Sequence, residues 1–406
     1  MMLASVRVCT GCSACVSACM VGAVAMMPDR DGFMRPQVDA AKCVRCGKCT
    51  KACPALNRKK GDLDSSDTGA LAFAAKSRDD ETRMGSSSGG LFHEMAKSIF
   101  ADGGVVFGCR LEKDTLHAVH SFAETVDELA PFRRSKYVQS DIGLSFRQCG
   151  DFLRKGRKVL FTGTPCQIAG LYGYLEENPG NLLTVDVFCH GVPSPAVFEK
   201  AKSEIAARAG ARLVSIEFRK KIRGEKWPYV EYCFDDSSKN FMELHYPTPF
   251  YQAFINDLCL RPSCHRCLFN AGRSGADITI ADFRNLALVR PDLCDDTGIS
   301  AMIVRSDRGK AFVERLLSVE RYDARYEQIV SNSRSYRNVN RRVPLSRRWF
   351  LANYKRLGLE RCVALSLRGG SWPRRQAFRL AHIGKTVVKR MLGYLRLSIM
   401  PLAESK

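Results

Sequence analysis

The sequence predicts an α+β protein in which a small cysteine-rich module precedes an α/β core and a basic, mostly helical C-terminal tail. Three observations lead to this fold class: a cysteine run that occurs twice near the N-terminus, apolar strands followed by Gly/Pro turns and helices in the middle, and a concentration of positive charge at the end. We expect the module at residues 1–58, a linker at 59–69, the core at 70–325 and the basic extension at 326–406.

The two cysteine runs share the pattern Cys-x2-Cys-x2-Cys-x3-Cys, and the second lies 34 residues after the first. This spacing resembles that of the bacterial two-cluster ferredoxin, in which the fourth cysteine of each run ligates the other cluster. Zinc sites and a disulfide framework are the alternatives, but zinc motifs use separated cysteine pairs and disulfide knots need a secreted chain. Met20 stands where the first run usually carries a proline. The resemblance implies two 4Fe-4S clusters, one held by Cys9, Cys12, Cys15 and Cys53 and the other by Cys43, Cys46, Cys49 and Cys19.

The segments after the cysteine runs can be assigned from their composition. Residues 23–39 alternate apolar and polar side chains around the turn-rich stretch from Asp29 to Gly32, which predicts a β-hairpin. Residues 56–69 carry charge, Gly and Ser but little apolar content, which is typical of a linker. A buried strand at 70–77 is expected to open the core.

The composition places the protein among globular intracellular chains. It has 406 residues and 18 cysteines, with no basic and apolar N-terminal stretch of the secretory kind, so we expect reduced thiols and a cytoplasmic location. No apolar run approaches the length of a membrane span. The formal charge of +21 is uneven, because residues 331–406 carry 18 Lys and Arg against two Glu.

The basic tail allows two interpretations. Residues 376–400 place apolar side chains at steps of three and four with Lys and Arg between them. Such a helix suits peripheral contact with an anionic membrane, or docking on the core with a solvated basic face. Charge alone does not predict nucleic-acid binding, since no nucleic-acid-binding fold or aromatic platform accompanies it.

Two stretches early in the core suggest an anionic ligand. The run from Ser86 to Gly90 precedes a helical pattern at 91–100, and small residues at a helix start expose backbone N–H groups that suit a phosphate or pyrophosphate. A plain cap and turn is the alternative. Lys136 and Tyr137 follow two arginines in FRRSKYVQS, which indicates either an anion-facing loop or a solvated basic one.

The middle of the core places cysteines in three turns. Two strand-and-turn units, at 157–180 and 182–195, put Cys166 and Cys189 at the carboxyl ends of their strands, where a shared crevice is expected. Cys264 and Cys267 form a CxxC, and the four cysteines together are the right number for a third 4Fe-4S cluster. The alternatives are buried packing residues, a zinc site, Cys166 as a nucleophile, and Cys259 as a rival ligand.

The later strands are predicted mainly from the alternation of residue types along the chain. Residues 214–246 alternate aromatic and charged side chains, which predicts antiparallel strands, and 276–283 predict a strand bracketed by Asp277 and Asp282. After Asp307 we expect helices.

Six stretches in order resemble the beta subunits of coenzyme F-420 (deazaflavin) hydrogenases and dehydrogenases and their bacterial relatives: SSSGGLF, RRSKYVQS, VLFTGTPCQIAGL, VDVFCHGVPSP, LRPSCHRCLF and ADITIADF. They span roughly residues 70 to 285. The resemblance implies an iron–sulfur flavoprotein with FAD in an α/β core, a core cluster on Cys166, Cys189, Cys264 and Cys267, and electron exchange between clusters, flavin and a substrate.

The resemblance also implies roles for single residues. It places Lys136 and Tyr137 near the flavin or substrate, and with Asp282 they are the candidate catalytic residues. Similar sequences read ITIGDFWG where Ala281, Arg284 and Asn285 stand here, so the substrate stays open. The implied FAD contacts are Ser87, Ser88, Gly89, Gly90, Gly163, Thr164 and Pro165.

The function predicted from the sequence is an oxidoreductase that relays electrons between 4Fe-4S clusters, FAD and a redox partner protein or a small-molecule acceptor or donor, of the deazaflavin type or another. Flavin is needed because clusters move one electron and hydride chemistry moves two. Two alternatives stay open: an electron-transfer subunit of a larger complex with no substrate of its own, and a non-catalytic regulatory relative.

Overall fold

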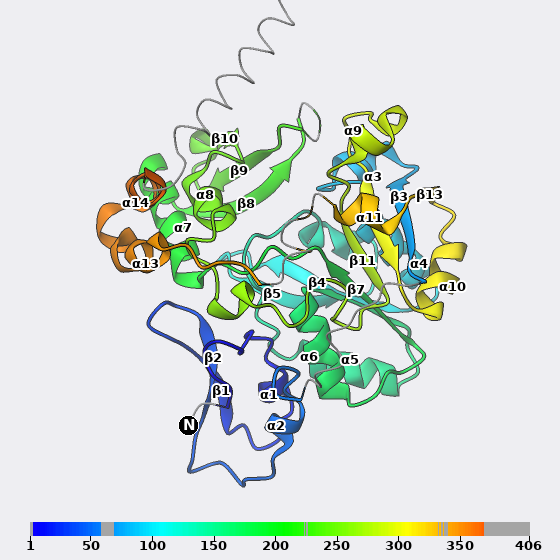
Figure 1. The fold of residues 1–406 in the computed structure, drawn as a ribbon, viewed down its shortest axis with the longest axis horizontal. Helices are drawn as coiled ribbons and strands as arrows, with labels where there is room; N and C mark the ends of the chain where they lie inside the picture. Colours follow the sequence, from blue (N-terminus) through cyan, green and yellow to red (C-terminus); the bar gives the residue numbers. More distant parts are fainter. Residues whose placement is uncertain are drawn as a thin grey trace, which may run out of the picture.

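The computed structural model describes residues 3–57, 69–222, 224, 226–331, 333, 336 and 340–368. Figure 1 shows three parts. The front module, residues 3–57, lies at the bottom of the view, a large mixed sheet lies to the right, and a small sheet with its helices lies at the upper left.

The front module consists of two short helices and one hairpin: α1 (Ala14–Ser17), β1 (Val24–Pro28), β2 (Met34–Val38) and α2 (Lys48–Lys51). β1 and β2 pair antiparallel with Val24 opposite Val38, which confirms the hairpin expected at 23–39. The Asp29 carboxylate accepts the backbone N–H groups of Asp31 and Phe33, both at 3.0 Å, and so closes the turn.

The core is built on an eight-stranded sheet in the order β13-β3-β12-β11-β7-β6-β4-β5. β4, β6, β7 and β11 run parallel to their neighbours within this group, and the other pairs are antiparallel. The strands are β3 (Leu71–Ser77), β4 (Val105–Leu111), β5 (Ala118–Ala123), β6 (Val159–Gly163), β7 (Leu182–Val187), β11 (Ile278–Asp282), β12 (Ser300–Val304) and β13 (Val319–Asp323).

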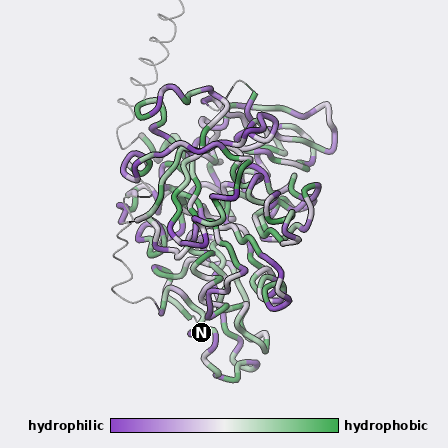
Figure 2. Tube along the Cα trace, turned by 90° about the vertical axis from the view of Figure 1, so that its right-hand side faces the viewer, coloured by the Kyte–Doolittle hydropathy of each residue, from purple (hydrophilic) through white to green (hydrophobic). Residues whose placement is uncertain are grey.

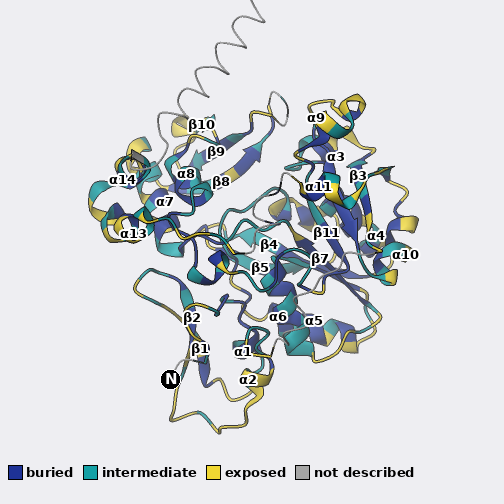
Figure 3. Cartoon of the chain, in the orientation of Figure 1, coloured by how far each residue is buried: buried dark blue, intermediate teal, exposed yellow. Residues whose placement is uncertain are grey.

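Helices cover both faces of this sheet because its central strands carry apolar side chains on both sides. In β6, Leu160 packs in one core with α4 (Leu91–Ala101) and α10 (Asp307–Arg315). Val159 and Phe161 pack in the other core with α5 (Ser145–Arg154) and α6 (Pro165–Leu175). Figures 2 and 3 show the result: hydrophobic, buried strands in the interior, with the more hydrophilic and exposed segments around them.

The small sheet has the order β10-β9-β8 and is antiparallel, as the alternation over 214–246 predicted. One hydrophobic core joins it to helices from distant parts of the chain, and Phe198, Phe218 and Phe350 are among its members. The strands are β8 (Leu213–Lys220), β9 (Tyr229–Phe234) and β10 (Phe241–Leu244), and the helices are α7 (Pro195–Ala209), α8 (Pro249–Ile255), α13 (Ser346–Leu357) and α14 (Leu359–Arg368).

Short elements complete the chain and carry several site residues. They are α3 (Asp80–Met84), α9 (Leu286–Val289) and α11 (Tyr326–Val330), with the 3-10 turns η2 (Asp127–Phe132), η3 (Ser237–Lys239), η4 (Pro262–His265) and η5 (Pro291–Leu293).

The mixed α/β architecture with a small front module confirms the predicted fold class. The expectation of helices alone after Asp307 was wrong, because β13 follows α10 and pairs with β3 at the edge of the sheet. Most of the expected linker and the tail helix at 376–400 lie outside the described residues. Within the described part, no helix combines the length and apolar character that crossing a membrane requires.

Candidate functional site

The four core cysteines line one cavity at the carboxyl ends of β6 and β7. Cys166 lies in the first turn of α6, Cys189 follows β7, Cys264 lies in η4 and Cys267 comes shortly after it. The cavity is partly open to solvent, and Thr10 of the front module is also in its wall. The crevice expected at these strand ends is therefore present, and it collects the cysteines of all three turns.

The thiols in this cavity influence one another. Burial raises the pKa of Cys166 and of Cys264 to about 12, and the neighbouring Cys267 thiol adds to both shifts. Burial also raises the pKa of Cys189 well above its usual range, with further contributions from Cys264, Cys166 and Cys267. Thiols whose pKa is raised in this way release their protons only when positive charge compensates them, which is the behaviour of metal-ligating cysteines.

The cysteines surround a space and do not converge on one point. Among the described residues, no group of three or more His, Cys, Asp or Glu side chains is arranged to hold a single metal ion.

Two of the alternatives raised for the core cysteines fit this geometry poorly. Cys259 is fully buried in the hydrophobic core of the small sheet and is not part of the cavity wall. The raised pKa of Cys166 is the opposite of what a nucleophilic thiolate needs, and its short side-chain contact is the Thr164 hydroxyl at 3.3 Å. The one histidine near it in sequence, His190, bonds to the Asp257 carboxylate at 2.8 Å.

The two cysteine loops of the front module have the same backbone path. Gly11 and Arg45, which are equivalent in the repeat, both have positive φ, at 71° and 56°. Ser13 and Gly47, also equivalent, have φ of 61° and 74° and stand as N-caps of α1 and α2. The repeat in sequence is thus a repeat in structure.

The fourth cysteine of each run lies beside the other run. The thiols of Cys9 and Cys53 both act on Cys15, whose pKa burial raises to about 12. Cys19 is buried in a small cluster against which Cys43 and Cys49 pack. This crossing is the arrangement that the ferredoxin spacing implies.

The front module docks with its first loop toward the core cavity. A Cβ on Gly170 of α6 would stand 3.1 Å from the Cys12 sulfur, so the absence of a side chain lets α6 approach that loop. The Cys9 carbonyl accepts the Ser263 hydroxyl at 2.9 Å, and the Thr10 carbonyl accepts the Gln139 amide at 3.0 Å. Cys46 in the second loop is exposed. Figure 3 shows exposed segments around α2.

The Ser/Gly run forms a loop pressed onto the large sheet before α4. Gly89 must lack a side chain, because a Cβ there would stand 2.6 Å from the Ala75 carbonyl oxygen. Ser87 shares a hydrogen bond of 2.9 Å with the Ser135 hydroxyl, and Ser88 donates to the Ile299 carbonyl at 3.0 Å. Gly90 caps α4 with a φ of 85°, which favours glycine.

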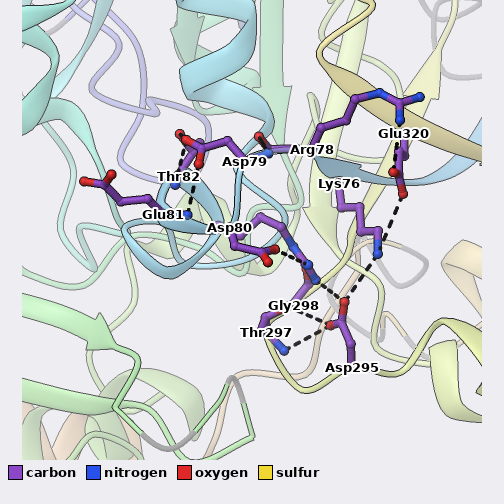
Figure 4. Close-up of polar contacts among 12 residues, drawn as sticks. Lys76, Arg78, Asp79, Asp80, Glu81, Thr82, Asp295, Thr297, Gly298 and Glu320 are labelled. Atoms are coloured by element: carbon purple, nitrogen blue, oxygen red, sulfur yellow. Dashed lines mark hydrogen bonds and ion pairs between the residues drawn. The ribbon is translucent and has the colours of Figure 1, made fainter.

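Charged contacts hold the segment that precedes this loop, as the close-up in Figure 4 shows. Asp295 accepts hydrogen bonds from the backbone and the hydroxyl of Thr297 and forms an ion pair with Lys76 at 3.4 Å. It also binds Arg83 of α3 at 2.5 Å, and Asp79 caps that helix through Glu81 and Thr82. The Ser/Gly run therefore follows a helix, α3, that these contacts hold in place.

The three candidate catalytic residues lie around β8. The Lys136 ammonium donates to the carbonyls of Pro131 and Arg133 at 2.8 and 2.5 Å, and burial lowers its pKa to about 8. Tyr137 packs against Phe218 and His245 at ring distances of 5.5 and 4.8 Å.

Tyr137 and Asp282 both interact with one arginine, Arg219. Asp282 forms an ion pair of 2.7 Å with Arg219, and the charges of both residues act on the Tyr137 hydroxyl, whose pKa is raised mainly by burial. The structure thus brings these two candidates together.

The predicted FAD contacts at the end of β6 lie close to the core cavity. Thr164 caps α6 and exchanges hydrogen bonds with Gln167, while Pro165 is part of the cavity wall beside Cys166. Gly163 is the last residue of β6 and approaches the Gln167 side chain.

Several residues of this region were not singled out from the sequence. Arg341 donates to the carbonyls of His190 and Cys264 and pairs with Asp257 at 2.9 Å. Arg261 is buried between the front module and the cysteine-bearing turn η4. The only signal in the sequence was the position of Arg261 three residues before Cys264.

Comparisons with known proteins agree with this architecture. Residues 156–327 match the family model for the C terminus of the coenzyme F420 hydrogenase/dehydrogenase beta subunit, and residues 8–57 and 35–89 match two 4Fe-4S dicluster domain models. A comparison with curated proteins finds no match.

Among solved structures, a chain of the xenon-derivatised F420-reducing [NiFe] hydrogenase complex from Methanosarcina barkeri is similar. The TM-score is 0.47 at 17% identity, over 66% of this chain and 88% of that one. The family matches confirm the resemblance read from the motifs. Residues 156–327 thus match the C-terminal part of the coenzyme F420 hydrogenase/dehydrogenase beta subunit, and a segment that matches a 4Fe-4S dicluster domain precedes them in the chain.

Proposed function

We propose that the protein is an iron–sulfur flavoprotein oxidoreductase in which electrons pass between the front module, a third 4Fe-4S cluster, FAD and a substrate or partner protein. The observation that carries this proposal is the cavity lined by Cys166, Cys189, Cys264 and Cys267. Three separate turns contribute to it. Thr10 in the same wall joins it to the first cysteine loop.

The contacts of the front module support an order along the relay. The loop of Cys9, Cys12 and Cys15 lies against α6 and the core cavity, whereas the loop of Cys43, Cys46 and Cys49 is the more exposed of the two. With the crossed ligation, Cys53 completes the inner site and Cys19 the outer one. The exposed Cys46 end is then where a redox partner protein would exchange electrons with the chain.

The residues expected to contact FAD belong to the Ser/Gly loop and to the segments beside it. The first turn of α4 begins directly after Ser87, Ser88, Gly89 and Gly90. Arg133 lies beside this loop, with its Nη1 atom 3.0 Å from where a Gly85 Cβ would stand, and its buried Nε has no hydrogen-bond partner in the described chain. A phosphate-bearing cofactor would supply that partner.

FAD and the clusters would divide the chemistry between them: clusters carry single electrons and flavin couples them to two-electron transfer. The chain's own groups would orient the substrate. Tyr137 is held by aromatic packing, and Arg219 and Asp282 form a fixed charged pair beside it. Lys136, with a pKa lowered to about 8 by burial, is a group that can hold or release a proton near neutral pH.

A second candidate function is an electron-transfer subunit without a substrate of its own. It is favoured by the contacts of the candidate catalytic groups, since the Lys136 ammonium is bound to backbone carbonyls and Asp282 is paired with Arg219. The replacement of the family's Gly and Trp by Ala281 and Arg284 points the same way.

The test is cofactor analysis after anaerobic purification. We expect about 12 iron atoms and one FAD per chain if all three clusters form. Cys166→Ser should remove about four irons and leave the front pair intact, whereas Cys259→Ser, a buried thiol outside the cavity, should leave all of them. About eight irons and no flavin in the unmodified protein would contradict the proposal. A loaded protein without diaphorase activity that copurifies with a partner would favour the electron-transfer subunit.

A further inference from the structure

One arginine is buried between the two sets of thiols. Arg261 is 1% exposed and lies on the loop that leads into η4, the turn that carries Cys264. Its guanidinium reaches into the front module, where a Cβ on Gly11 would stand 2.6 Å from Nη2. The positive charge of Arg261 is thus placed at the junction of the inner front site and the core cavity.

The contacts of this guanidinium are neutral. Nη1 donates to the Met34 carbonyl and Nη2 to the Gln139 side-chain oxygen, each at 3.0 Å. The group also lies over the Phe33 ring, 5.1 Å from its centroid, and its Nε has no hydrogen-bond partner among the described residues. These contacts fix the guanidinium in place without neutralising it.

No carboxylate in the described chain forms an ion pair with Arg261, and this distinguishes it from its neighbour. Arg35 is also buried, but Asp29 pairs with it at 2.7 Å. Burial lowers the pKa of Arg261, and the thiols that act against this shift are those of Cys9, Cys264 and Cys166. Burying an unpaired charge is strongly unfavourable, so these sulfurs are the counter-charge that the site provides when they are ligated as thiolates.

We propose that Arg261 is the shared counter-ion of two iron–sulfur sites, the inner front site at Cys9 and the core site at Cys166 and Cys264. This inference rests on the function proposed above and deepens it. Each site gains one negative charge on reduction, and a fixed cation between them stabilises both reduced states. Arg261 therefore raises both reduction potentials. It is a positioning and tuning residue, since electrons need not pass through it.

The test is a redox titration followed by EPR on the anaerobically purified full chain. Arg261→Gln removes the charge while its amide can still bond the Met34 carbonyl, and the reduced-to-oxidised ratio of both sites at a fixed potential should fall roughly tenfold, or about 59 mV. Arg261→Lys keeps the charge and should restore most of the potential. Arg157→Gln is the control for losing an arginine elsewhere: Arg157 donates to the backbone carbonyls of Gly103 and Gly104 before β4, pairs with Glu124 at 2.8 Å, and lies at the amino ends of the strands whose carboxyl ends precede the cysteines.

A second variant tests the charge without removing the arginine. Gln139→Glu is nearly isosteric and gives the Nη2 atom a carboxylate partner at the position of the present 3.0 Å hydrogen bond. It should lower both potentials in the same direction as Arg261→Gln. If Arg261→Gln does not load its clusters, this variant carries the test on its own.

The outcomes separate this inference from the proposed function. Unmodified protein with about eight irons would contradict the third cluster itself. Protein with all its irons whose two potentials are the same in the unmodified, Arg261→Gln and Gln139→Glu forms would contradict only the role of Arg261. A shift as large in Arg261→Lys as in Arg261→Gln would also contradict it, because the effect would then follow the shape of the side chain and not its charge.

Discussion

Gly173 of α6 meets Ala52 of the front module so closely that a Cβ on the glycine would stand 2.4 Å from the Ala52 carbonyl oxygen. Glycine is unfavourable inside a helix by about 1 kcal/mol relative to alanine, so the close approach is a reason for its place here. Gly170, one turn earlier, meets Cys12 in the same way. Helix α6 therefore carries Cys166 at its start and the docking surface of the front module along its length.

Gly173→Ala should weaken this docking. The clash is with backbone and cannot be relieved by a rotamer change, so we expect a loss of about 1–3 kcal/mol in stability and a smaller magnetic interaction between the front clusters and the proposed core cluster. Thermal unfolding and EPR of the reduced protein would measure the two effects. Gly150→Ala in α5 is the control, because the nearest atom to its added Cβ is the flexible end of Arg154 at 3.3 Å. Equal stability of the two variants would contradict the docking role.

The crossed ligation proposed for the front module gives a second prediction. Cys53→Ser should perturb the inner front cluster, whose Cys12 ligand lies against Gly170 of α6, and should therefore narrow the interaction-broadened EPR signal of the proposed core cluster. Cys19→Ser should perturb the outer cluster and leave that broadening in place. The opposite pattern would mean that each run ligates its own cluster without crossing.

The exposed second cysteine loop predicts where a protein partner exchanges electrons. Arg45 and Lys48 are exposed, form no ion pair with the described residues, and lie near the exposed Val44, which is 64% accessible. Reversing both charges with Arg45→Glu and Lys48→Glu should slow electron exchange with an acidic carrier about tenfold or more at low salt, and high salt should reduce the difference. Lys155→Glu and Lys239→Glu, at other exposed positions, should have little effect. If the rate of electron exchange did not change in the Arg45→Glu and Lys48→Glu variant, the carrier would exchange electrons at another surface.

The parts of the fold that the sequence predicted are those with strong local patterns. The apolar runs of β3, β6 and β7 and the alternation of β8 and β9 each signal a strand without help from the rest of the chain. β13 does not, because Val319–Asp323 is an edge strand of mostly charged residues whose pairing with β3 satisfies the backbone. Its strand character comes from the partner and not from its own sequence.

The residues of the candidate site likewise fall into those that local sequence patterns predict and those that depend on contacts between distant segments. Cysteine spacing predicted the front ligand sets and drew attention to Cys166, Cys189, Cys264 and Cys267, because spacing is a local property. Arg261 could not be assigned a role from sequence, since its importance depends on Gly11 and Gln139, which are distant in the chain. The internal hydrogen bonds of Ser87 and Ser88 likewise appear only in three dimensions.

His120 makes the stability of the core depend on pH. The ring is buried between the Ser140 hydroxyl at 2.6 Å and the Thr162 carbonyl at 2.7 Å, and burial lowers its pKa to about 4. A neutral ring that donates to Thr162 and accepts from Ser140 satisfies both partners. Because the unfolded chain binds the proton more readily, the folded state loses stability as the pH falls from about 6.5 toward 4.

Replacing this ring should remove that loss. Between pH 7 and pH 5 the His120 contribution is about 2 kcal/mol, so His120→Gln, although less stable at pH 7, should lose about 2 kcal/mol less than the unmodified protein over this interval. Anaerobic urea unfolding at the two pH values would measure the difference. His117→Gln is the control, since His117 is an exposed side chain paired with Glu199 at 3.3 Å. If His120→Gln lost as much stability on acidification as the unmodified protein, a neutral buried His120 would not be the source of the acid sensitivity.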